Sequence, residues 1–147
     1  MKAVKETKIT VSEIAYRVHK LEELYRAIYN YYSMPETSKI VIETRKRENA
    51  TIYIIPPEEA EMLLEYIMYY LQKPAGTVIP SPKSIARTIM QVFLERKTPN
   101  ALLFEDERRE IKVSPGYVPI IVYREYCLTH WRIEALEIPP VRICLVC

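Results

Sequence analysis

The last 21 residues of this chain contain all three of its cysteines and one of its two histidines. They are spaced as Cys127-x2-His130-x13-Cys144-x2-Cys147, so four soft ligands fall into two close pairs. Two such pairs are the arrangement that a tetrahedral zinc site requires, and four protein ligands leave no open position for a substrate. We therefore predict one structural zinc ion, which would tie the last strand to the 127–130 segment.

Two other states of the cysteines stay open at this point. Cys144 and Cys147 lie in an apolar run, 141–147, and a free thiol often packs as a small apolar residue. A short-range disulfide between these two cysteines is the second alternative, because intracellular disulfides do occur in proteins of hyperthermophiles. Neither close pair has the glycine and proline that usually shape a zinc knuckle.

Length and composition predict one folded domain over residues 1–147. Hydrophobic residues make up 49% of the 147 positions and charged residues 27%, with only two glycines. Segments 1–56, 57–113 and 114–147 are a possible subdivision into a helix with a hairpin, a winged-helix-like unit and a zinc-stapled tail.

No apolar run approaches the roughly 18 residues of a membrane span, and the N-terminus lacks a secretory signal. We expect an intracellular, cytoplasmic protein with no membrane partner. Glutamine and asparagine are scarce while Glu, Arg and Ile abound, a composition that resembles small proteins of hyperthermophilic archaea and their viruses.

The pattern of residues predicts three helices. Thr10-Val-Ser-Glu13 has the form of a capping box and opens a helix that runs to about Ser33. Its apolar stripe is Ile14, Val18, Leu21, Tyr25, Ile28 and Tyr32. Pro57 followed by two glutamates opens a second helix, and Ser81-Pro82 opens a third over 82–97, in which Ile85, Ile89, Val92 and Phe93 form the buried stripe.

Between these helices the sequence predicts antiparallel β-hairpins. The β-rich runs 39–44 and 51–55 flank a polar tip, and 101–104 and 110–113 flank another. The 118–123 segment is a strand that we expect at an edge or a start, since Pro119 lacks a donor. A C-terminal strand pair would be closed by the zinc site. The predicted fold class is therefore α+β with mostly antiparallel strands.

The order helix, loop, helix, hairpin over 57–113 resembles a winged helix-turn-helix DNA-binding domain. The resemblance covers about 57 of the 147 residues and rests on element order. It implies that 82–97 is the recognition helix and 101–113 the wing, so Lys83 and Arg87 would contact phosphates or bases. The wing tip, Glu105-Asp106-Glu107, is acidic and departs from this pattern because DNA phosphates would repel it. Alternatively, the two cations merely solvate an amphipathic helix.

A second basic patch is Arg45, Lys46 and Arg47, at the tip of the first predicted hairpin. Residues 1–47 have ten Lys and Arg against six Glu, and the remainder has eleven against thirteen acids, which sums to the total of +2. This tip could contact a phosphate backbone without reading sequence, or it could simply keep the strand ends soluble.

These features predict a small zinc-containing regulator or accessory protein that binds nucleic acid, with DNA as the preferred class. The alternative is a self-associating structural or interaction protein, such as a virion component. Tyrosine is favoured at interfaces, and each of the first two predicted helices has tyrosines on more than one face, among them Tyr25, Tyr29, Tyr31, Tyr32, Tyr66, Tyr69 and Tyr70. We expect no enzymatic activity and no small-molecule substrate. Glu110-Ile-Lys112 matches half of a restriction-type nuclease site, but its acidic partner would lie only four or five residues back.

Overall fold

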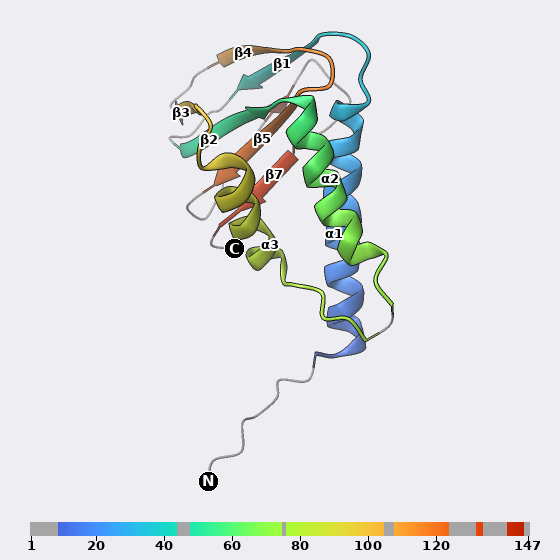
Figure 1. Cartoon of the computed structure of the whole chain (residues 1–147). Helices are drawn as coiled ribbons and strands as arrows, with labels where there is room; N and C mark the ends of the chain where they lie inside the picture. Colours follow the sequence, from blue (N-terminus) through green and yellow to red (C-terminus); the bar gives the residue numbers. More distant parts are fainter. Residues whose placement is uncertain are drawn as a thin grey trace.

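The computed structural model of the chain describes residues 9–43, 48–74, 76–104, 108–123, 132–133 and 141–145. In this part of the chain the fold is α+β, as predicted, with helices packed beside two small sheets of mostly antiparallel strands (Figure 1). The helices are α1 (Val11–Tyr32), α2 (Pro57–Leu71) and α3 (Pro82–Ile89), which continues directly into the π-helical segment η1 (Met90–Leu94).

The three helices begin where the sequence predicts them. The Thr10 hydroxyl oxygen accepts a hydrogen bond from the Glu13 amide at 3.2 Å, and the Ser81 hydroxyl accepts one from the Ser84 amide at 3.2 Å. Helix α2 begins at Pro57. Proline fits the first position of a helix because the N–H that it lacks would have no partner within the helix there. Local signals therefore account for all three starts: a hydroxyl cap for α1 and α3, and a proline at the first position for α2.

The end of the third helix differs from the prediction of a single helix over 82–97. The α-helical turns stop at Ile89, and the Glu95 amide then donates to the Met90 carbonyl at 2.8 Å, five residues back. This wider turn leaves Phe93 and Leu94 buried, whereas Val92, expected in the buried stripe, is 66% exposed. The burial of two consecutive large side chains explains why the regular α-helical register is not kept.

In the part of the chain that the structure describes, seven strands form two sheets. The four-stranded sheet has the order β3-β2-β5-β7 and the three-stranded sheet has the order β4-β1-β6. The strands are β1 (Ser38–Glu43), β2 (Glu48–Ile55), β3 (Asn100–Phe104), β4 (Arg108–Val113), β5 (Val118–Tyr123), β6 (Arg132–Ile133) and β7 (Val141–Cys144).

The two predicted hairpins are wrong in their pairing. Strand β1 pairs with β4, with Glu43 opposite Arg108, and β2 pairs with β3, with Glu48 opposite Phe104. Consecutive strands thus pass into different sheets instead of folding back on each other. Short separation along the chain favours a hairpin, but tertiary pairing of two distant segments has replaced it here. The tips of both predicted hairpins, 44–47 and 105–107, lie outside the described residues.

The C-terminal strands also pair differently from the prediction. Instead of forming a pair, β6 lies antiparallel to β1, and β7 lies parallel to β5. Strand β5 is an interior strand and not an edge. Pro119 is tolerated near its start because only β2 pairs with it there, through Ile54, and pairing with β7 begins at Ile120.

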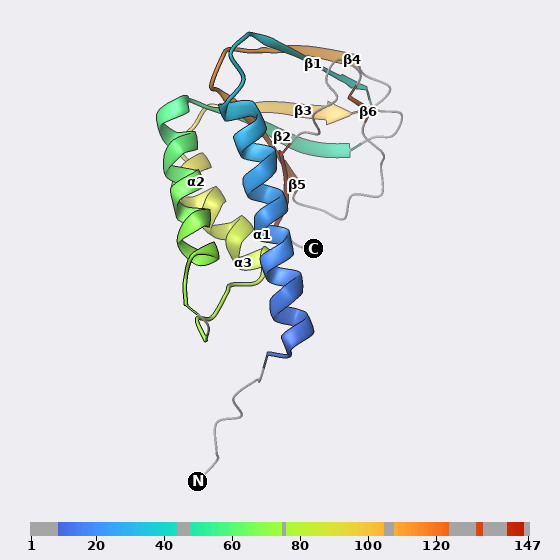
Figure 2. The same ribbon diagram turned by 90° about the vertical axis from the view of Figure 1, so that its right-hand side faces the viewer.

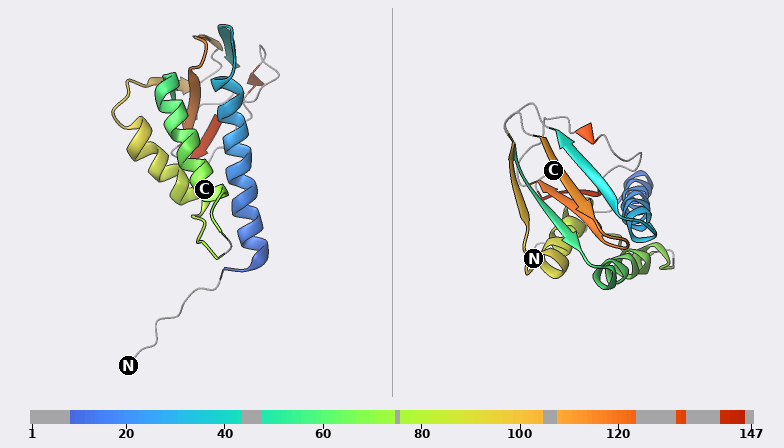
Figure 3. Two further views of the ribbon diagram at one scale, coloured as in Figure 1. Left: turned by 45° about the vertical axis from the view of Figure 1, so that its right-hand side comes forward. Right: turned by 90° about the horizontal axis from the view of Figure 1, so that it is seen from above.

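One continuous core joins the helices to the four-stranded sheet. Helix α1 packs against α2, α3, β5 and β7, and Figure 2 shows α1 and α2 side by side in front of α3. The core cluster extends from Leu21 of α1 to Ile143 of β7, which is what a single domain requires. Figure 3 shows the helices gathered along one side of the strands.

The predicted apolar stripe of α1 is only partly buried. Its members Leu21 and Ile28 lie in the core, whereas Ile14 is 41% exposed. Tyr31, which is not part of the predicted stripe, is also buried. The N-terminal turns of the helix extend past the sheet (Figure 1).

Candidate nucleic-acid interface

A groove of about 860 Å³ lies between α1, the start of α3 and β7. That volume is in the range of ordinary ligand sites. The residues lining it are Tyr16, Arg17, Lys20, Leu21, Glu23, Leu24, Arg26, Ala27, Asn30, Pro80, Pro82, Lys83, Ile85, Ala86, Arg142, Ile143 and Cys144.

The groove combines an apolar lining with several cations. Leu21, Ile85 and Ala86 are buried core residues that also line it, so its base is continuous with the hydrophobic core. Its charged residues are five cations and a single carboxylate, that of Glu23. The basic residues come from three separate elements, α1, α3 and β7. A concave surface with this excess of one sign favours an anionic ligand.

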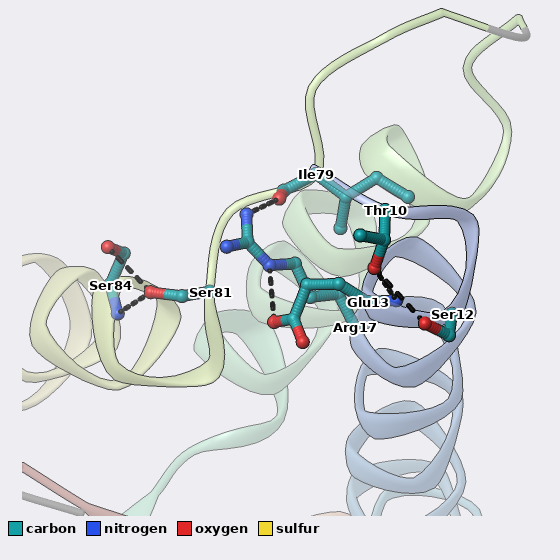
Figure 4. A network of polar contacts seen from close by, with 7 residues as sticks. All are labelled: Thr10, Ser12, Glu13, Arg17, Ile79, Ser81 and Ser84. Atoms are coloured by element: carbon teal, nitrogen blue, oxygen red, sulfur yellow. Dashed lines mark hydrogen bonds and ion pairs between the residues drawn. The ribbon is translucent and has the colours of Figure 1, made fainter. Parts of the chain in front are cut away.

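The Arg17 side chain fixes one wall of the groove. Its guanidinium donates to the Ile79 carbonyl at 2.8 Å and pairs with Glu13 at 3.1 Å, one helical turn earlier (Figure 4). The hydrogen bond to Ile79 attaches the loop before α3 to α1, and the ion pair with Glu13 holds the guanidinium in place for it. The same loop carries the Ser81 cap, so the two contacts help to place the start of α3, and with it Lys83, beside α1.

The Glu23 carboxylate is balanced by neighbours on its own helix. It lies 2.8 Å from the His19 ring nitrogen Nε2 and 3.6 Å from Nζ of Lys20. By contrast, Arg26, Lys83 and Arg142 form no side-chain hydrogen bond or ion pair with any other residue that the structure describes. These three cations are therefore the ones available to an incoming anion.

The sequence-predicted contacts are distributed unevenly around this groove. Lys83 lines it, and Arg87 is exposed one helical turn further along α3 without lining it. The basic triplet Arg45, Lys46 and Arg47 lies outside the described residues, so its role stays a prediction. Arg26 and Arg142 were missed, because no local motif marks them and only the packing of β7 near α1 brings them together.

The expected winged-helix geometry is present only in part. Helices α2 and α3 follow in the expected order, but β3 and β4 pair with β2 and β1 and do not form a two-stranded wing. Glu110 of the half nuclease motif forms a 2.9 Å ion pair with Lys39 across the β1–β4 pair.

Cys144 lies at the C-terminal end of β7, lines the groove and is disulfide-bonded. The other predicted zinc ligands, Cys127, His130 and Cys147, lie outside the described residues. Within the described ranges there is no group of three or more His, Cys, Asp or Glu side chains that could hold a metal. Zinc binds thiolate, so Cys144 could serve as a ligand only after reduction of its disulfide.

The tyrosines of α1 and α2 are divided between core and surface. Burial raises the pKa of Tyr31 to about 12. The negative charge of Glu61, whose carboxylate accepts a 3.5 Å hydrogen bond from the Tyr32 hydroxyl, raises the pKa of Tyr32. Tyr29 and Tyr69 are about half exposed, at 49% and 56%. Tyrosine thus serves both the core and the outer faces of these helices.

Comparison of the chain with protein-family models, curated proteins and solved structures finds no match. Among the helices that the structure describes, none is long and apolar enough to cross a membrane.

Proposed function

We propose that the protein binds nucleic acid in the groove between α1, α3 and β7. The observation that supports this most strongly is the convergence of Arg26, Lys83 and Arg142 from three elements onto one concave surface, unpaired within the described chain. The five cations of the groove outnumber its single carboxylate, and phosphate contacts supply most of the affinity of sequence-independent binding.

The shape of the groove suits a strand of phosphates. It extends along α1 from Tyr16 to Asn30, which is about 21 Å at 1.5 Å per residue. Lysine and arginine contacts to phosphate position a nucleic acid without reading its sequence. The apolar residues and the half-exposed ring of Tyr16 offer surfaces for bases, as in proteins that bind single strands. We therefore propose weak sequence preference, with DNA as the expected class.

The test is direct binding with a matched pair of double variants. Lys83→Gln with Arg142→Gln removes two groove cations, and Arg96→Gln with Lys112→Gln removes two exposed cations elsewhere. Both change the net charge by the same amount. Fluorescence anisotropy with labelled single-stranded and duplex DNA and RNA should show roughly tenfold weaker binding for the groove variant at 0.15 M salt, because two phosphate contacts are lost. The control should bind almost as the wild type does.

Equal losses in the two variants would show that only the net charge matters, and no binding by the wild type would remove the proposal. The predicted zinc has no part in this mechanism. If present, it would tie β7 to the 127–130 segment.

A further inference from the structure

One face of α2 has an exposed stripe that combines acidic and large apolar side chains. Its members are Glu58, Glu61, Met62, Glu65 and Tyr69, all exposed and within about 100° of one another around the helix. Met62 is 58% exposed and Tyr69 is 56% exposed, while the opposite face of α2 is buried. The stripe therefore presents three carboxylates together with two large apolar side chains.

These carboxylates are largely unmatched within their own chain. Glu58 and Glu65 form no ion pair with any residue the structure describes, and Glu61 accepts only the long hydrogen bond from Tyr32. At the C-terminal end of the stripe, the Lys73 ammonium lies 3.7 Å from the centroid of the Tyr69 ring. Exposed apolar surface rimmed by like charge is typical of an interaction site.

We propose that the acidic stripe of α2 in one copy docks into the basic groove of a second copy. The charges are complementary, since three carboxylates would face Arg26, Lys83 and Arg142. The apolar parts also correspond, because Met62 and Tyr69 would cover the apolar lining of the groove. The lengths are compatible as well: from Glu58 to Tyr69 the stripe spans about 17 Å, which fits within the 21 Å of the groove along α1.

The two surfaces can be used at the same time by one molecule. No residue of α2 lines the groove, so a copy whose groove is occupied still presents its own stripe. Such a head-to-tail contact is heterologous and builds a closed ring or an open filament rather than a two-fold dimer. Nucleic acid and the stripe would compete for the same cations, so added DNA is expected to dissociate the assembly.

Sedimentation velocity of the full chain over a range of concentrations tests this inference. We expect assemblies larger than a dimer, and an association at least tenfold weaker in the variant that combines Glu58→Gln, Glu61→Gln and Glu65→Gln. The control combines Glu22→Gln, Glu36→Gln and Glu95→Gln, three exposed carboxylates outside α2, with the same change in charge. A monomeric wild type, or equal effects of the two triple variants, would overturn the inference.

A charge swap gives a second, positive test. Glu61→Lys with Glu65→Lys makes the stripe basic. Arg26→Glu with Lys83→Glu and Arg142→Glu makes the groove acidic, because four carboxylates then face the two remaining cations. Each variant alone should be monomeric, and an equimolar mixture should assemble because each stripe then meets a groove of opposite charge. Failure of the mixture to assemble would contradict the docking. The Glu→Gln stripe variant should bind DNA at least as tightly as the wild type does, because its stripe no longer competes for the groove. Loss of this inference and loss of the proposed function are therefore distinguishable.

Discussion

Replacement of Gly116 by alanine should destabilise the protein by two separable effects. Gly116 has φ of +81° in the turn between β4 and β5, where the Tyr117 amide donates to the Ser114 carbonyl at 3.1 Å. An alanine in this region of φ costs about 1–2 kcal/mol. A Cβ there would also lie only 2.9 Å from Cγ of Pro57, the residue that begins α2. Overpacking of this kind costs about 1–3 kcal/mol, so we expect a total of roughly 2–5 kcal/mol.

Gly76 provides the matched control. Its φ is +95°, and a Cβ there would meet nothing within 4 Å. Gly76→Ala should therefore cost about 1–2 kcal/mol, through backbone strain alone. Urea unfolding followed by circular dichroism gives both free energies of unfolding. Equal losses in the two variants would refute the close packing of the β4–β5 turn against the start of α2.

Three further predictions concern ionisation, metal content and salt. Burial raises the pKa of Tyr31 to about 12, whereas the unfolded chain releases this proton near pH 10. Stability should therefore fall by roughly 2 kcal/mol between pH 10 and 12, and much less in Tyr31→Phe, as thermal melts across this range would show. The Cys/His spacing predicts about one zinc per chain by elemental analysis of protein prepared with reductant, and the disulfide at Cys144 predicts none in oxidised protein. Zinc-free reduced protein would contradict the spacing argument. Three unpaired groove cations predict a slope of about −2 for log K against log salt on single-stranded DNA, and a slope near zero would contradict phosphate contact.

The helices could be predicted from the sequence because their signals are local. The Thr10 and Ser81 hydroxyls cap the first turn from a distance of three residues, and Pro57 fits the first position of a helix. Such signals need no knowledge of the tertiary structure. The α+β class followed from the same reasoning and from the β-rich runs between the helices.

The strand pairing could not be predicted, because it depends on contacts between distant segments. The runs that became β1 and β2 have the composition of strands, but nothing in them specifies β4 and β3 as partners. The π-helical segment escaped prediction for a similar reason, since the burial of Phe93 and Leu94 is set by the core and not by local propensity.

Of the groove cations Arg26, Lys83 and Arg142, only Lys83 could be predicted from the sequence. Lys83 was found through its position in the first turn of the third helix. Arg26 and Arg142 are 116 positions apart in the sequence and belong to no motif. They become part of one site only because β7 pairs in parallel with β5 and thereby lies against α1 and α3.

The most direct test of the groove as the binding surface is mapping by NMR of amide chemical-shift changes while a short single-stranded DNA is added to the labelled protein. The account predicts that the largest changes fall on residues 16–30, 80–86 and 141–144. Changes centred instead on the basic triplet Arg45–Arg47, or on β1 and β4, would place the interface elsewhere and contradict the account.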